Sequence, residues 1–251
     1  MSGTPLSTSL TNRFIFGANS QVHKNLSYTN DETIAYVAGH SIVLYNTTDK
    51  RQRFLNGAEI TDQITAYASG PGKRLGAVAE RGEKPQVHVF DLRTFRRKKT
   101  LSASEGGSRD IVAICFSEDD QLMMTLSGAP DWSISVWNWA KAKLVATMQV
   151  STPAAGSLPI NDINFSPIDS TVLTCIGKEY VKFYRTSDKE MRVLHETHLP
   201  GKNVVSMCWM RHPEDHLLVG TDCGDIMLFR AGQYVMTLPN APGPTDGQPC
   251  R

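Results

Sequence analysis

The stretch DWSISVWNWAKAKLV, residues 131–145, brings Trp132, Trp137 and Trp139 close together in the sequence. Aromatic side chains this dense stack on nucleic-acid bases, line a ligand cage or fill a hydrophobic core. Lysine and arginine number 26 against 25 aspartates and glutamates, so the net charge does not favour a nucleic acid or an anionic membrane as partner. The rest of the chain decides among these alternatives, because the stretch recurs.

Five short segments share one pattern, an apolar run that ends in an aromatic residue. They are SIVLYN (41–46), QVHVFD (86–91), SISVWN (133–138), YVKFYR (180–185) and DIMLFR (225–230). Aligned on Tyr45, Phe90, Trp137, Phe183 and Phe229, the pattern returns every 45 to 47 residues, and only Lys182 interrupts the apolar register. This period lies just above the ~40–45 residues of a WD-repeat blade.

The sequence around each segment completes a four-stranded unit. An apolar hairpin with a turn rich in Gly, Pro, Asp or Asn precedes it, and a weaker strand follows it. We therefore predict an all-β fold, a WD-repeat-type β-propeller of about five four-stranded blades over residues 13–238. Trp137 is predicted to lie in the core, whereas Trp132 and Trp139 have no counterparts in the other repeats and stay open as surface or contact residues.

The ends of the chain differ in composition from the repeats. Residues 1–12 are expected to form a flexible N-terminus, and residues 239–251, rich in Pro and Gly, a disordered tail. Propellers close with about four to eight blades, so five blades make either a closed ring or an incomplete, open arc. An open arc would expose strand edges and apolar faces through which the chain could associate with itself.

The order of segments resembles the N-terminal propeller portion of the WD-repeat cilia- and flagella-associated proteins. The resemblance rests on FIFGANSQVHKNLSYTNDETIAYVAGHSIVLYN (14–46), INFSPIDSTVLTCIGKEYVKFYR (163–185) and VGTDCGDIMLFRAGQ (219–233). It implies a non-enzymatic axonemal scaffold of motile cilia that helps assemble or position inner dynein arms on doublet microtubules. The implied location is the cytoplasm and cytoskeleton, in the cilium axoneme.

The same resemblance leaves other interpretations open. Family members continue into a long coiled coil, and no heptads occur in these 251 residues. The chain is therefore expected to be a fragment, a truncated product or a short paralogue. A general cytoplasmic WD-repeat adaptor for protein partners is the alternative function, since one fold hosts many functions.

One basic cluster stands out as a candidate contact for an anionic partner. The stretch RTFRRKK (93–99) carries five cations, predicted on a solvent-facing loop between the third and fourth strands of the second blade: Arg93, Arg96, Arg97, Lys98 and Lys99. Several cations together give salt-sensitive affinity for an acidic protein surface, such as acidic tubulin tails. A nuclear-import signal and an ordinary solvated turn are the other interpretations.

No catalytic, cofactor-binding or metal-binding residues are predicted. SGPGKRLGAV (69–78) lacks the Lys-Ser/Thr pair and the following helix of a phosphate-binding loop, so it indicates a hairpin turn. The histidine pairs His195 with His198 and His212 with His216 lack the thiolate pair that would complete a zinc site. No nucleophile elbow is present. We expect protein partners, and no small-molecule substrate, nucleic acid or membrane.

Overall fold

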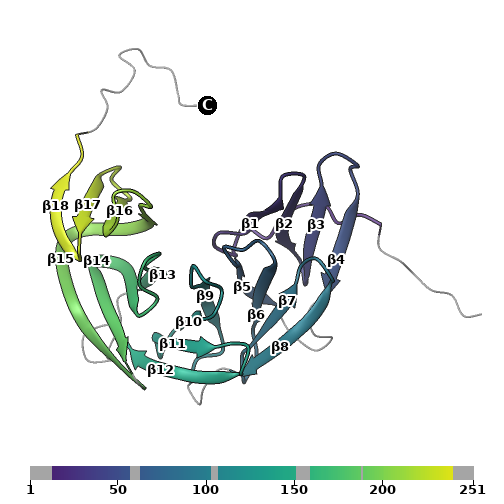
Figure 1. Ribbon diagram of the computed structural model, residues 1–251, viewed down its shortest axis with the longest axis horizontal. Coiled ribbons are helices and arrows are strands. Elements are labelled where there is room, and N and C mark those ends of the chain that lie inside the picture. The colour runs from purple at the N-terminus through teal and green to yellow at the C-terminus, as the bar shows by residue number, and fades with distance from the viewer. Residues whose placement is uncertain (1–12, 57–62, 103–106, 151–158, 188, 240–251) are drawn as a thin grey trace, which may run out of the picture.

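The structure, a computed structural model, describes residues 13–56, 63–102, 107–150, 159–187 and 189–239. Within these ranges the chain is all-β, as the sequence predicts (Figure 1). In the same ranges, no helix is long and apolar enough to cross a membrane.

The first three blades are antiparallel four-stranded sheets whose strands pair in chain order. The first blade consists of β1 (Leu26–Asn30), β2 (Thr33–Ala38), β3 (Ser41–Asn46) and β4 (Gln52–Asn56). The second consists of β5 (Ile64–Ser69), β6 (Leu75–Glu80), β7 (Gln86–Asp91) and β8 (Arg96–Ser102). The third consists of β9 (Ile111–Phe116), β10 (Met123–Ser127), β11 (Ser133–Asn138) and β12 (Lys143–Gln149).

The last two blades share one continuous sheet. Its strands are β13 (Ile160–Phe165), β14 (Val172–Ser187), β15 (Glu190–Trp209), β16 (His216–Thr221), β17 (Ile226–Arg230) and β18 (Gln233–Thr237). β14 folds back on itself, because the Thr186 amide donates to the Thr171 carbonyl at 2.8 Å and Glu179 between them has the left-handed φ of a turn, 68°.

β15 runs from the fourth blade into the fifth. Its first half pairs with β14, with Tyr180 opposite His198, and its second half pairs with β16, with Met207 opposite Val219. β13, the two arms of β14 and the first half of β15 therefore make the fourth blade. The second half of β15 with β16, β17 and β18 makes the fifth, and the prediction of five four-stranded blades is confirmed.

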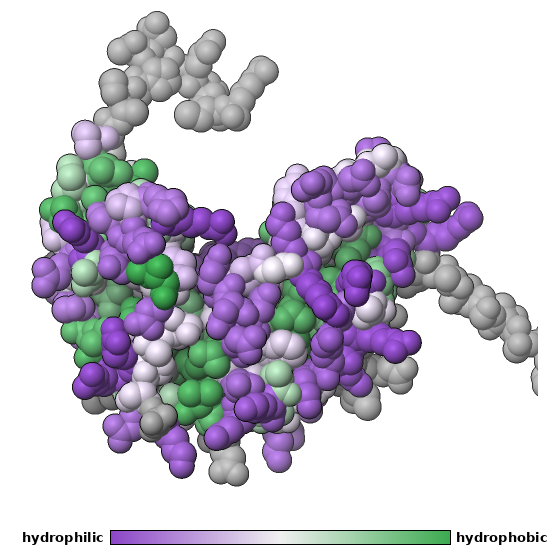
Figure 2. Space-filling model, viewed as in Figure 1, coloured by the Kyte–Doolittle hydropathy of each residue, from purple (hydrophilic) through white to green (hydrophobic). Residues whose placement is uncertain are grey.

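The five blades form an open arc and not a closed ring. Figure 1 shows β1, β5, β9 and β13 on the inside of the arc, and a gap between the first and last blades. In the space-filling view the gap is a notch between the two ends (Figure 2). Of the two alternatives left by the sequence, the incomplete propeller is the one that the structure shows.

Apolar clusters fill each of the four spaces between successive blades. Inner strands are apolar at successive positions because both faces of a blade are covered, as in Met123, Met124 and Leu126 of β10, all fully buried. Burial of such side chains contributes about 1.5–3 kcal/mol each. Packing between blades therefore provides the main stabilisation of the arc.

The tryptophans of the opening stretch all pack against these clusters. Trp137 is 7% exposed in the cluster between the second and third blades, as predicted, and its Nε1 donates to Thr125 Oγ1 at 3.0 Å. Trp139 lies beside the same cluster and donates to the Asp120 carbonyl at 2.7 Å. Trp132 packs against the next cluster. Trp132 and Trp139, which the sequence left open as surface or contact residues, are both partly buried, so neither is freely exposed.

The structure corrects the repeat alignment in the fourth blade. In the second, third and fifth blades a bulge in the pairing of the third and fourth strands directly precedes the aromatic residue, Phe90, Trp137 or Phe229. In the fourth blade that bulge precedes Tyr184 and not Phe183.

The direction in which the side chains pack agrees with this correction. Tyr184 packs toward the third blade, as Trp137 packs toward the second, whereas Phe183 packs toward the fifth. Tyr184 is therefore the equivalent of Trp137. The apparent break in the apolar pattern at Lys182 resulted from an alignment shifted by one residue.

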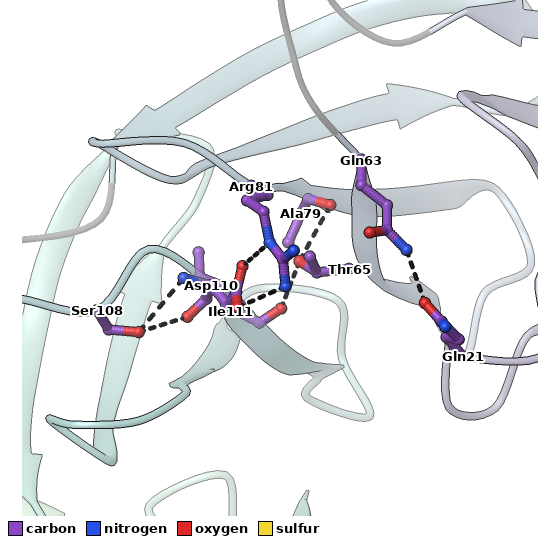
Figure 3. Close-up of polar contacts among 8 residues, drawn as sticks. All are labelled: Gln21, Gln63, Thr65, Ala79, Arg81, Ser108, Asp110 and Ile111. Carbon is purple, nitrogen blue, oxygen red and sulfur yellow. Dashed lines mark hydrogen bonds and ion pairs between the residues drawn. The ribbon is translucent and has the colours of Figure 1, made fainter.

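Polar contacts add to the apolar packing at the rim where the chain enters the second and third blades (Figure 3). The Arg81 guanidinium binds both carboxylate oxygens of Asp110, at 2.5 and 2.8 Å, and joins the second blade to the segment before β9. Thr65 Oγ1 donates to the Ile111 carbonyl at 2.7 Å. Gln63 Nε2 donates to Gln21 Oε1 at 2.9 Å, toward the first blade. These contacts fix neighbouring blades in register.

One ion pair joins blades that are far apart in the sequence. Lys24, just before β1, places its Nζ 2.6 Å from Oδ2 of Asp162 in β13. The Asp162 side chain is only 4% exposed, and its other carboxylate oxygen accepts the Ile163 amide at 2.9 Å. The contact links the segment before the first blade to the fourth blade.

We predict that Lys24→Met destabilises the chain by about 1–3 kcal/mol, because it leaves a buried carboxylate without its cation. The free energy of unfolding in urea measures this loss. Lys50→Met is the matched control: Lys50 has a similar left-handed backbone (φ 55° against 53°) and no ion pair with a described carboxylate.

The double variant Lys24→Met/Asp162→Asn should recover part of the lost stability, because it removes the buried charge as well. Equal losses in Lys24→Met and Lys50→Met would contradict a structural role for the pair.

Candidate interaction surface

The predicted basic cluster lies on the outer hairpin of the second blade, formed by β7, the turn 92–95 and β8. Arg93 lies in the turn, as predicted. Arg96, Arg97, Lys98 and Lys99 do not lie in a loop but form the first half of β8. This part of the prediction is wrong because the strand pairs with β7 from Asp91 onward. We call residues 91–99 the basic hairpin.

Asp91, which sequence reasoning did not select, organises the basic hairpin. Its side chain is 1% exposed. One carboxylate oxygen accepts the amides of Arg93 and Thr94, at 3.1 and 2.9 Å. The other is 2.9 Å from both Nε and Nη2 of Arg74 and 3.6 Å from Lys98 Nζ. Asp91 thus closes the turn and neutralises one cation of β8 and one of the β5–β6 turn.

These contacts shift the titration of Asp91. Burial alone would raise its pKa, but the hydrogen bonds from the Thr94 amide and from Arg74, with the charge of that guanidinium, outweigh burial and hold the pKa well below its usual range. The carboxylate therefore stays ionised in the folded chain under all ordinary conditions.

A cation from the first blade also reaches the basic hairpin. The Arg53 guanidinium of β4 lies 3.6 Å from the centre of the Phe95 ring, a cation–π contact. Phe95 has a left-handed φ of 59°, and its ring packs against the cluster between the first and second blades. Sequence reasoning missed this contact because Arg53 and Phe95 come from different repeats, and no local pattern links them.

The five cations of the prediction do not form one cluster. Lys98 pairs with Asp91. Cross-strand partners share a face of the sheet, so Arg97, opposite Phe90, points to the side of the first blade, and Lys99, opposite Val89, to the side of the third. Arg93, Arg96, Arg97 and Lys99 are exposed, and none of them has an ion pair with a carboxylate in the part of the chain that the structure describes. These four are the cations available to an anionic partner.

The glycine-rich segment 69–78 forms the β5–β6 hairpin. The Gly70 amide donates to the Leu75 carbonyl at 2.9 Å, and the Lys73 amide to the Gly70 carbonyl at 2.8 Å. The Gly72 amide donates to Oδ2 of Asp120 in the neighbouring blade, at 3.1 Å. The two backbone hydrogen bonds confirm that this segment is a hairpin turn. The Asp120 carboxylate already accepts the Gly72 amide.

The four histidines considered for zinc lie on β15, on β16 and in the segment between them. Among the described residues, no group of three or more His, Cys, Asp and Glu side chains is arranged to hold a metal ion. The arrangement of side chains on the basic hairpin can attract and orient an acidic surface, and it contains no nucleophile paired with a base.

The fold and this surface define a class: an open, WD-repeat-type propeller arc that presents charged hairpins at its rim. No protein-family model matches the chain. The chain is similar to cilia- and flagella-associated protein 57 of Mus musculus, with 26% identity over 221 residues, 87% of this chain and 17% of the relative.

Two further relatives agree with that similarity. Cilia- and flagella-associated protein 57 C of Tetrahymena thermophila is 26% identical over 182 residues, 68% of this chain and 14% of its own length. Cilia- and flagella-associated protein 44 of Mus musculus is 24% identical over 224 residues, 88% of this chain and 12% of its own length. The resemblance to the ciliary WD-repeat proteins is confirmed, and the chain spans less than a fifth of the length of these relatives.

We predict that Asp91→Asn lowers the free energy of unfolding by about 1–3 kcal/mol at pH 7, because charge-assisted hydrogen bonds to a buried group are lost. The folded-state pKa of Asp91 lies below its unfolded value, so its contribution is complete above about pH 4 and falls as the pH drops below that. Urea unfolding from pH 7 to pH 3 measures the difference, which should shrink toward the acid end. Asp31→Asn, at an exposed turn position, is the control, and a pH-independent difference for Asp91→Asn would contradict the assignment.

Proposed function

We propose that this chain is a non-enzymatic scaffold of the ciliary axoneme, which helps to assemble or position inner dynein arms on doublet microtubules. The observation that carries the proposal is the similarity over 87% of the chain to a cilia- and flagella-associated protein, in a region that folds as five consecutive blades. A repeat arc that presents many turns along its rims is suited to contacts with proteins.

The basic hairpin supplies a physical basis for attachment. Four exposed cations of this hairpin, none paired with a carboxylate of the described residues, attract an acidic protein surface such as the acidic tails of tubulin. The attraction weakens with salt. We propose that these cations contribute to binding the axoneme. The alternative, a cytoplasmic adaptor without a ciliary role, uses the same surface for other partners.

The ends of the arc support a second property, self-association. Large apolar side chains are exposed on the first blade and the segment before it, and on the fifth blade: Phe14, Phe16, Leu26, Tyr28, Val205, Ile226, Val235 and Met236. Hydrophobic surface also gathers near β18 in Figure 2. Self-association through these ends stays a prediction, which light scattering over a range of concentrations would measure.

The proposed function is tested by location in cells with motile cilia. A fluorescently tagged chain should remain with the axoneme after detergent removes membrane and soluble protein. Diffuse fluorescence that is lost on extraction would instead favour the cytoplasmic adaptor.

The role of the hairpin is tested by charge reversal. Arg93→Glu/Arg97→Glu should reduce axonemal retention several-fold at physiological salt, roughly 0.15 M, because two attractions become repulsions. Lys141→Glu/Lys143→Glu is the matched control: it makes the same charge change on the corresponding hairpin of the third blade. Equal retention of both variants would contradict a specific role for the basic hairpin.

A further inference from the structure

A groove of about 1280 Å³ lies between the first and second blades. Hairpin turns of both blades form its walls: Asn30 and Thr33 flank the β1–β2 turn, Asn46 and Arg51 the β3–β4 turn, and Gly72 lies in the β5–β6 turn. The β7–β8 turn completes the second wall with Arg93 and Phe95. The groove therefore runs along one rim of the arc, with one edge at the basic hairpin.

The charge of the groove is strongly one-sided. Six cations line it: Arg13, Arg51, Arg53, Lys73, Arg74 and Arg93. Among the described residues that line it, Asp49 is the only acid, and Asp91 just beyond them neutralises Arg74. The whole chain has a formal net charge of only +1. This concentration of positive charge is thus a local property of the groove, and a concave surface of one sign attracts the opposite sign.

The groove also has apolar surface. Leu44 and Leu92, 5% and 3% exposed, lie at its base, where the two blades pack together. Phe14, 53% exposed, lies at one side of the groove. The packing of the two blades already covers Leu44 and Leu92, so Phe14 supplies the apolar surface that a ligand can contact. A ligand with an apolar side chain among its acids would match both features.

Hydrogen bonds and a cation–π contact within the chain hold the walls of the groove in place without a ligand. Asn46 Oδ1 accepts the Thr48 and Asp49 amides, at 2.9 and 2.7 Å, and fixes the β3–β4 turn. Across the groove, Asp91 fixes Arg74, and the Phe95 ring holds the guanidinium of Arg53. Preorganised cations bind with a smaller loss of conformational entropy than free side chains.

We propose that the groove between the first and second blades binds an extended acidic peptide with a hydrophobic side chain at its centre. Glutamates or aspartates pair with Arg51, Arg53 and Arg93, and the hydrophobic side chain contacts Phe14. The inference rests on the proposed function in one respect: it supplies the chemistry of a partner for a protein scaffold. A nucleic acid is the less favoured ligand, because Phe95, a potential stacking surface, is covered by Arg53.

The test uses a short fluorescein-labelled peptide of glutamates with one central phenylalanine, and fluorescence anisotropy with the purified full chain. Arg51→Glu/Arg53→Glu should weaken binding about tenfold or more. Lys141→Glu/Lys143→Glu, which makes the same change of charge one blade beyond the groove, should bind as the unaltered chain does. Circular dichroism and thermal unfolding establish that both variants are folded.

Two further ligands separate the specific groove from general attraction of charge. A peptide with alanine in place of the phenylalanine should bind several-fold more weakly, and an oligothymidylate of equal charge should bind more weakly than the acidic peptide. Equal weakening by both charge-reversal pairs, no effect of the phenylalanine, tighter binding of the oligonucleotide, or no peptide binding would each overturn the proposal. Axonemal retention of the tagged chain is a separate measurement in ciliated cells, so failure of the groove and failure of the ciliary role are distinguishable.

Discussion

The structure depends on one constraint: each four-stranded blade has two apolar faces, and each face needs a neighbour. No single blade has a sheltered interior, so the clusters between blades are the core of the molecule. The aromatic residue after the bulge serves this packing, since Phe90, Trp137, Tyr184 and Phe229 all point toward the preceding blade. Tyr45 has the same place in the first blade but is only half-buried, because no described blade precedes it.

Polar contacts add direction to this packing. Hydrophobic attraction has no preferred direction, whereas the contact of Arg81 with Asp110 and that of Lys24 with Asp162 need a particular geometry. The hydrophobic contacts thus stabilise the arc, and the ion pairs specify how the blades are oriented within it. The basic groove arises at the rim from the same arrangement, because it exists only while the first two blades keep their relative position.

The sequence predicts the fold well and the site in part. The repeat period near 46 residues and the apolar segments indicate the five blades, because packing on both faces leaves a local, periodic signature. The alignment in the fourth blade fails by one residue, since YVKFYR offers two neighbouring aromatics and only the position of the bulge distinguishes Tyr184 from Phe183.

At the surface the local signal is weaker. Five cations in seven residues indicate the basic hairpin, but their division between two faces of β8 follows from pairing with β7. Asp91 belongs to β7, Arg53 to β4 and Arg74 to the β5–β6 turn, and these residues have no sequence pattern in common. Contacts between separate repeats are specified by the fold and not by local sequence, so they cannot be read before the fold is known.

The shared strand β15 has a mechanical consequence. The fourth and fifth blades are joined by a continuous backbone sheet, whereas the contacts described between the first four are made mainly by side chains. A force that pulled the two ends of the arc apart would therefore first strain the side-chain contacts between the first four blades, here called the seams. The fourth and fifth blades would move together as one rigid body. In an assembly exposed to repeated bending, such a difference in stiffness would confine strain to the seams between the earlier blades, including the one that carries the basic groove.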